Sequence, residues 1–283
     1  MTIALGVLVN DGLVIAADSA TTLMGQDQQT GAVTVFNVYE SANKIFNLYK
    51  GLPIGGYTFG AGAIGDASIA TLAKDFRAEL TDHKPIGPGG WVFDPNAYTI
   101  EDVAIAARQY LFEDRYVPAF AKAPNKPVLG FFVGGYSSGE GLPEVWQVLV
   151  DGKGACAAPT AVKARGTYGV VFAGEPDAIQ RLLFGFGTGL PAALAAAGVA
   201  EADIPAMIAK VQGMLEVPLA PPAMPIQDVI ELAEFLTYLT IKFSKFKPGA
   251  PTVGGPIEIA AITKHEGFKW VRRKHYFDID HNP

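Results

Sequence analysis

The start of the chain constrains the fold most, because two apolar segments follow each other across a tight turn. Thr2 to Val9 is an apolar, β-branched run, and Leu13 to Ala17 is another. Between them stands Asn10-Asp11-Gly12, whose residues tolerate the positive φ angles of a tight hairpin. The sequence therefore predicts an opening β-hairpin whose first strand begins at Thr2, which would hold inside the fold a segment that usually frays.

Further strands are predicted where β-branched and aromatic residues cluster between turn signals. They span residues 33–39, 44–49, 54–59, 128–134, 144–150, 169–172, 257–263 and 268–273. The polar stretch 25–31 is predicted to be a loop or long turn. The last two strands should form a hairpin around His265-Glu266-Gly267.

Helical spacing of apolar residues predicts helices over 66–80, 100–112, 175–184 and 226–246. Asp66 suits the N-cap of the first of them. Residues 185–225 hold Ala-rich helical material that ends in Pro221-Pro222. We interpret this stretch as an inserted surface element that contacts another subunit.

Helices thus come in pairs between runs of antiparallel strands, unlike the regular alternation of a parallel sheet. The predicted class is α+β, and the predicted architecture is a four-layer αββα sandwich of two antiparallel sheets flanked by helix pairs. A chain of 283 residues can build this as a single domain over residues 1–283, with the helical insertion at 185–225.

The charge balance does not favour nucleic-acid binding, since the chain has 28 acidic and 22 basic residues. The basic cluster Arg272, Arg273 and Lys274 is interpreted as a solvated strand end. Cys156 is the sole cysteine, so no internal disulfide can form, and a small core residue in a cytoplasmic protein is expected.

The sequence also disfavours a membrane protein and a metal-binding protein. The segment after Met1 lacks the basic region of a secretory signal, and the most apolar stretch, 192–200, is too short to span a bilayer. The four histidines, His83, His265, His275 and His281, are scattered without ligand spacing. We therefore expect no metal, no cofactor and no membrane partner.

Three residues of the first fifty suggest a nucleophilic site. Removal of Met1 would give Thr2 a free α-amine, which is substantially neutral near pH 7 to 8 and can act as base for the threonine hydroxyl. A lysine beside Thr2, such as Lys44, would depress the pKa of that amine and stabilise oxyanion charge. Asp18, at the end of the second strand, would keep Lys44 charged and oriented.

Residues 60–65 read Gly-Ala-Gly-Ala-Ile-Gly, which fits the dinucleotide-binding pattern G-x-G-x-x-G. That pattern requires a following parallel strand with an acidic residue at its end. Here the segment from Thr81 to Pro85 opens a Pro/Gly-rich loop instead. We favour a glycine corner that presents a backbone N–H to an oxyanion, with Gly62 as its donor.

Taken together, Thr2-Ile3-Ala4-Leu5-Gly6-Val7, residues 10–19 and Asn43-Lys44-Ile45-Phe46 closely resemble the opening of proteasome β-subunits. The resemblance to proteasome β-subunits continues through Val133-Gly134-Gly135-Tyr136 to residues 252–257. The sequence of 252–257 resembles that of bacterial proteasome homologues such as Anbu. With Thr2 as the mature first residue, Asp18 falls on the family's invariant aspartate, and Gly62 resembles its oxyanion-hole glycine.

The resemblance implies an N-terminal-nucleophile hydrolase fold and a threonine endopeptidase that cuts peptide or unfolded protein. Thr2, Asp18 and Lys44 would be catalytic, and Thr21 and Thr22 would line the substrate cleft with Gly62. It also implies homo-oligomeric stacked rings, with an ATPase unfoldase as a possible partner.

The chain departs from the family at two positions that support the terminal amine. Gly174-Glu175 stands where active β-subunits have Gly-Ser, and Ala250 stands where they have an aspartate. Glu175 and Thr252 are the residues that would replace this support. Two alternatives therefore remain open, a catalytically silent scaffold subunit and a non-peptide amidohydrolase with the same nucleophile.

Overall fold

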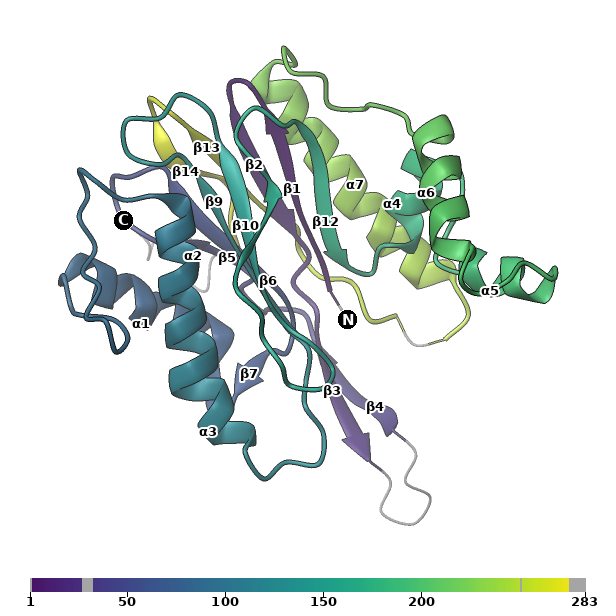
Figure 1. Cartoon of the computed structure of the whole chain (residues 1–283), viewed down its shortest axis with the longest axis horizontal. Coiled ribbons are helices and arrows are strands. Elements are labelled where there is room, and N and C mark those ends of the chain that lie inside the picture. Colours follow the sequence, from purple (N-terminus) through teal and green to yellow (C-terminus); the bar gives the residue numbers. More distant parts are fainter. Residues whose placement is uncertain (1, 27–32, 250, 275–283) are drawn as a thin grey trace.

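The computed structural model describes residues 2–26, 33–249 and 251–274, with side chains described except at 22–26 and 33–36. Within these residues the chain has a mixed α+β fold with two large antiparallel sheets, as predicted (Figure 1). The first sheet has the order β12 (Gly169–Gly174), β1 (Ile3–Val9), β2 (Gly12–Ala17), β13 (Glu258–Thr263), β14 (Gly267–Arg272). The second has the order β11 (Thr160–Lys163), β10 (Glu144–Val150), β9 (Leu129–Gly135), β6 (Ile54–Gly60), β5 (Ile45–Asn47).

The predicted opening hairpin is β1 and β2, with Asn10 and Asp11 as its two-residue turn and Val9 paired with Gly12. Side chains of β1 alternate between the two faces of the sheet, as a strand requires. Ile3, Leu5, Val7 and Val9 enter one hydrophobic core, whereas Ala4 and Leu8 enter another. Both faces of the strand are therefore buried, which explains its continuous apolar sequence.

The core between the two sheets contains residues from both of them. Leu8, Leu13 and Ile15 of the first sheet meet Tyr57 and Phe132 of the second. The rings of Tyr57 and Phe132 stack with centroids 4.4 Å apart. This contact joins the sheets face to face, an arrangement compatible with a sandwich.

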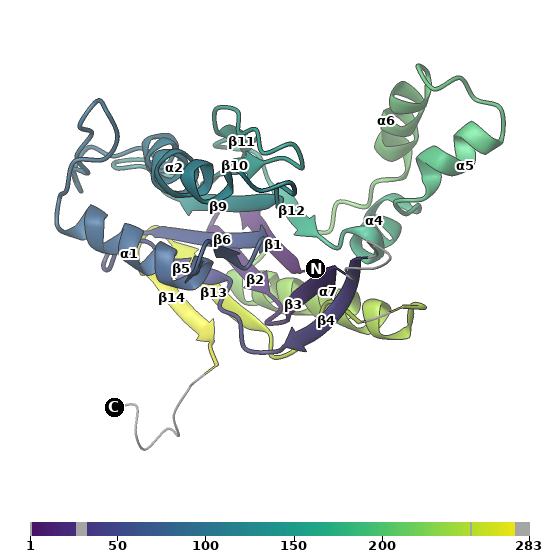
Figure 2. The same cartoon turned by 90° about the horizontal axis from the view of Figure 1, so that it is seen from below.

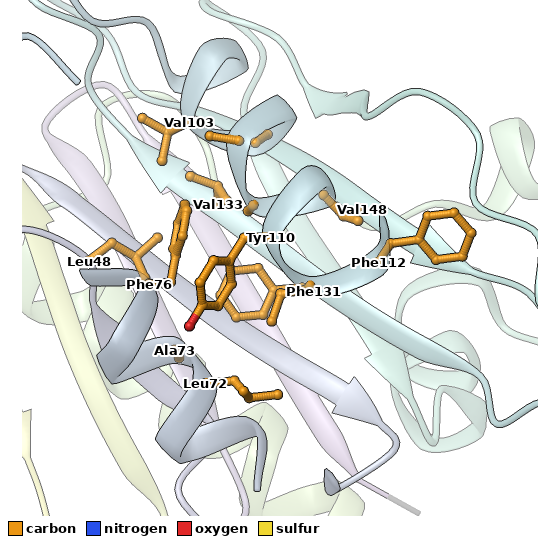
Figure 3. Packing of buried hydrophobic residues seen from close by; sticks show 14 of the residues in the cluster. Leu48, Leu72, Ala73, Phe76, Val103, Tyr110, Phe112, Phe131, Val133 and Val148 are labelled. Carbon is orange, nitrogen blue, oxygen red and sulfur yellow. The ribbon is translucent and has the colours of Figure 1, made fainter. Parts of the chain in front are cut away.

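Helices cover the other face of the second sheet. They are α1 (Ile69–Thr81), α2 (Ile100–Arg108), the π-helical segment η1 (Gln109–Tyr116) and α3 (Val117–Phe120). Their apolar side chains form one core with β9 and β10. Figure 3 shows Phe76 and Tyr110 turned toward Phe131 of β9, and Cys156 belongs to the same core as expected.

The outer face of the first sheet is covered by α7 (Ile226–Phe246), whose Val229, Ala233 and Leu236 pack on β1 and β2. Helix α4 (Asp177–Phe184) packs beside α7. The segment interpreted as an insertion contains α5 (Leu190–Ala196) and α6 (Ile204–Leu215). In Figure 2 these two helices project away from the sheets.

Several predicted boundaries were wrong. Gly25 and Gln26 belong to a strand, β3 (Thr21–Gln26), which pairs with β4 (Val33–Tyr39). The loop predicted at 25–31 is therefore wrong at its start, and residues 27–31 lie outside the described residues. Strand β11 was not predicted, and the strand expected at 44–49 is only the short β5.

The first helix begins later than its sequence suggests. Ser68, not Asp66, is the N-cap of α1, with its hydroxyl accepting a hydrogen bond from the Thr71 N–H at 3.1 Å. Asp66 lies instead in the turn between two short strands, β7 (Ala63–Ile64) and β8 (Ala67–Ser68). The predicted helix 100–112 is wrong at its end too, because η1 and α3 continue it to Phe120.

In the described part of the chain, no helix is both long enough and apolar enough to cross a lipid bilayer.

Candidate functional site

The site is built on a buried ion pair where the opening hairpin ends. Lys44 Nζ donates a hydrogen bond to Asp18 Oδ1 at 2.6 Å. Asp18 is fully buried and Lys44 is 5% exposed. Asp18 directly follows β2, and Lys44 directly precedes β5, so the pair joins the two sheets.

Three backbone groups complete the surroundings of the Asp18 carboxylate. Oδ1 also accepts from the Ile3 N–H at 3.0 Å, and Oδ2 accepts from the N–H groups of Ala20 at 3.1 Å and Gly254 at 3.0 Å. Hydrogen bonds to a carboxylate replace the water that it loses on burial. In addition to Lys44, the carboxylate is therefore fixed by its own turn at Ala20 and by two distant segments, which carry Ile3 and Gly254.

Thr2 lies next to this pair and is 4% exposed. Its carbonyl accepts a hydrogen bond from the Glu175 N–H at 2.8 Å, while the next peptide N–H, that of Ile3, binds Asp18. Alternation along β1 places Ala4 on the face between the sheets, so continuing it by two residues brings Thr2 to the same face. The Thr2 backbone is thus held from both sides.

Gly174 is required for this arrangement. Its φ is +100°, a region that L-residues rarely adopt, and a Cβ there would stand 1.8 Å from the Thr2 carbonyl oxygen. The Gly174-Glu175 step therefore supports the Thr2 backbone through close approach and one hydrogen bond. The Glu175 carboxylate is 3.6 Å from Lys247 Nζ.

Burial lowers the pKa of Lys44, and Asp18 opposes that change by stabilising the ammonium. A second cation, Lys274, lowers the pKa of Lys44 further, and Glu258 raises it. Lys44 is therefore a lysine with a reduced pKa beside a threonine near the start of a strand.

A cleft of about 410 Å³ opens beside these groups. Thr2, Lys44, Thr21 and Gly62 all line it, so the structure brings these four predicted site residues to one cavity. A Cβ added at Gly62 would lie 3.3 Å from Thr21 Cγ2, which places the two residues against each other. Among the described residues, no group accepts a hydrogen bond from the Gly62 N–H.

For the remaining predicted residues, the structure describes no hydrogen bond with Thr2. Thr22 pairs with Val38 in the β3–β4 ribbon, and its side chain lies outside the described part. Thr252 is 7% exposed, and no hydrogen bond joins it to Thr2 in the described structure. Ala250 lies outside the described residues.

The sequence assigns no role of its own to Gly254, which lies within residues 252–257, yet its N–H binds Asp18 directly. The interpretation of Lys274 as part of a solvated strand end was wrong, because its side chain is 10% exposed and lies 3.4 Å from the buried carboxylate of Glu258. Arg272 and Arg273 do face solvent. A pair of adjacent exposed arginines gives no local signal that the next lysine turns inward.

The Gly60–Gly65 stretch does not form a dinucleotide loop. The β7–β8 hairpin separates Gly62 from α1, and both neighbours of β6 run antiparallel to it. That geometry removes the helix N-terminus on which a pyrophosphate would sit. In the part of the chain that the structure describes, no three His, Cys, Asp or Glu residues gather in a way that could hold a metal ion.

The arrangement unites a hydroxyl, a buried ammonium and a glycine backbone corner around one cleft. Such a set can activate a nucleophile and stabilise negative charge on a carbonyl oxygen. Comparisons with protein-family models and with curated proteins find no match for the chain.

Proposed function

We propose that this chain is a threonine-type peptidase with the N-terminal-nucleophile hydrolase fold of proteasome β-subunits. The observation that carries the proposal is the buried Asp18–Lys44 pair, whose lysine lines the same cleft as Thr2. Desolvating two charges is costly, and a buried pair beside a cleft is a typical arrangement of functional sites.

In this proposal, removal of Met1 gives Thr2 a free α-amine. The Thr2 hydroxyl attacks the carbonyl carbon of the peptide bond, and the α-amine takes up its proton. That proton passes to the leaving amine when the C–N bond breaks, which leaves the acyl group as an ester on Thr2. Water then hydrolyses the ester and restores the hydroxyl.

Lys44 would tune the protonation of the α-amine, and Gly62 would stabilise the negative charge that develops in this reaction. The ammonium of Lys44 disfavours protonation of the nearby α-amine, which keeps part of it available as base. The Gly62 N–H faces the negative oxygen of the tetrahedral intermediate. Asp18, which binds both Lys44 and the Ile3 N–H, keeps the lysine aligned with the Thr2 backbone.

The proposed substrate is an extended peptide or unfolded protein, with Thr21 and Thr22 beside the scissile bond. We further propose a cytoplasmic homo-oligomer of stacked rings, to which an ATPase unfoldase can deliver substrate. Helix α6 offers contact surface for such an assembly, since Met207, Met214 and Leu215 are 40%, 76% and 51% exposed.

Reaction with a peptide epoxyketone, which can bond to both the hydroxyl and the amine of a terminal threonine, tests the proposal. We expect an adduct that peptide mapping places on Thr2, and peptide hydrolysis that Thr2→Ala abolishes. Intact mass should show that Met1 is absent from the labelled protein. Hydrolysis at the unaltered rate by Thr2→Ala would rule the nucleophile out.

One observation favours the scaffold alternative. Glu175 stands where the resemblance places an amine-binding serine, and its carboxylate faces Lys247. A protein that retains Met1, forms no adduct and still assembles would be a silent subunit. Hydrolysis of small amides without hydrolysis of peptides would instead indicate the amidohydrolase.

A further inference from the structure

A second buried ion pair lies on the same side of the first sheet as the proposed site. Ala4, Ala17 and Glu258 occupy one row across β1, β2 and β13. Directly paired residues share a face, so Glu258 points between the sheets, as Ala4 and Ala17 do. With strands about 4.8 Å apart, the Glu258 Cα lies about 10 Å from that of Ala4.

Glu258 is 1% exposed, and its Oε2 accepts no hydrogen bond within the described structure. A carboxylate buried in this way needs a compensating charge. Lys274 supplies it, with Nζ 3.4 Å from Glu258 Oε2. The lysine that follows β14 therefore forms the ion pair of this buried acid.

Lys274 also binds the two segments that carry the Asp18–Lys44 pair. Its ammonium donates to Ser19 Oγ at 2.8 Å and to the carbonyl oxygen of Ala42. Ser19 follows Asp18 directly, and Ala42 lies two residues before Lys44. One ammonium thus bridges the chain on both sides of the first ion pair.

We propose that Lys274 and Glu258 are positioning residues for Lys44, holding the Asp18 and Lys44 segments together and balancing the charge around the ammonium of Lys44. This inference rests on the proposed function and deepens it. In this inference the Asp18–Lys44 pair and the Glu258–Lys274 pair together form a cluster of two lysines and two acids. Neither residue of the second pair lines the cleft, and the proposed role of both is exerted through Lys44.

Among the described residues, the charges that act on Lys44 are Asp18, Lys274 and Glu258, and removal of Met1 would add the Thr2 α-amine. Lys274 disfavours the ammonium form of Lys44, and Glu258 favours it. Loss of the Glu258 charge alone therefore leaves Lys274 unopposed and makes the surroundings of both Lys44 and the amine more positive. Loss of both charges restores the balance.

The test compares Glu258→Gln, Lys274→Arg and the double variant E258Q/K274M in the full chain. We measure the acidic midpoint of the pH profile of peptide hydrolysis and, separately, the titration of the Lys44 13Cε signal, assigned with Lys44→Arg. Glu258→Gln should lower both midpoints by about 0.5 to 1 pH unit. Lys274→Arg keeps the charge and should leave them in place, and the double variant should return them toward the wild type.

A role in packing alone predicts a different result. All variants would then lose activity in proportion to their loss of thermal stability, with both midpoints unmoved, and that outcome would overturn the proposal. The titration of Lys44 needs no activity. If the wild-type protein forms no Thr2 adduct while the Lys44 midpoint still shifts with Glu258→Gln, the peptidase proposal fails and the charge coupling stands.

Discussion

The ammonium of Lys44 and the carboxylate of Asp18 differ in how many partners hold them. Asp18 accepts four hydrogen bonds, one from Lys44 and three from backbone N–H groups. The Lys44 ammonium, by contrast, donates its hydrogen bond to Asp18 Oδ1 at 2.6 Å. The carboxylate would therefore keep most of its stabilisation without the lysine, whereas the lysine depends on the carboxylate.

This asymmetry predicts an order of stabilities. Asp18→Asn should lower the free energy of unfolding by about 3 to 5 kcal/mol, because it removes the carboxylate that is hydrogen-bonded to the buried ammonium and turns an amide toward N–H donors. Lys44→Met should cost less, since the three N–H groups still bind the carboxylate. Urea unfolding at pH 7 measures both values.

The control is the double variant D18N/K44M, in which neither charge remains. It should be more stable than Asp18→Asn alone, because the unpaired ammonium is gone. A larger loss of stability for Lys44→Met than for Asp18→Asn would contradict the asymmetry of the pair.

The sequence predicts well those parts of the fold that depend on patterns among neighbouring residues. Helix α7 and strand β10 have the predicted bounds, since their periodicity and flanking residues are continuous. The approach of Asp18 to Ile3 follows from the two-residue turn, which pairs Ala4 with Ala17. A hairpin register can be counted from the sequence once the turn is known.

The parts that the sequence does not predict depend on contacts between distant segments. Glu258 and Lys274 meet because β13 pairs with both β2 and β14, and a bulge after Ile259 shifts the β14 register. No local pattern marks that geometry. Strand β11 is similar, because its half-exposed sequence becomes a strand only beside β10.

Gly174 provides a test of how Thr2 is positioned. In Gly174→Ala the new Cβ would stand 1.8 Å from the Thr2 carbonyl oxygen, and φ at this position is +100°. The start of β1 must therefore move, and we expect a loss of at least about tenfold in Thr2 labelling by the epoxyketone, since small misplacements of reacting groups are costly.

Gly189→Ala is the matched control. Gly189 has a φ of −79°, and nothing lies within 4 Å of the added Cβ. This variant should label at the wild-type rate. Equal labelling of Gly174→Ala and the wild type would show that the Thr2 backbone does not depend on this close approach.

Tyr57 is expected to limit stability. Its hydroxyl is fully buried between the sheets and has no hydrogen-bond partner in the described structure, so burial raises its pKa. Tyr57→Phe keeps the ring stack on Phe132 and removes the unsatisfied oxygen. The free energy of unfolding in urea should therefore rise by about 1 kcal/mol.

Tyr116→Phe provides the comparison, because the Tyr116 hydroxyl donates to the Pro127 carbonyl at 2.7 Å. Its loss leaves that acceptor unpaired and should lower the free energy of unfolding by about 1 kcal/mol. Changes of opposite sign in the free energy of unfolding would support the hydrogen-bond assignments of both hydroxyls. Destabilisation by both variants would refute the assignment of the Tyr57 hydroxyl as unpaired.

Tyr98 should make the fold sensitive to alkali. Burial raises its pKa to about 12, above the value near 10 of an exposed phenol. The folded protein therefore binds this proton more tightly than the unfolded chain does. Its contribution to stability is complete below about pH 10 and is lost as the pH rises through about 12. Tyr98→Phe has no proton to lose, so its free energy of unfolding should fall less steeply across this interval. Urea unfolding at a series of pH values measures the slopes, and parallel slopes for the variant and the wild type would exclude this phenol as the source.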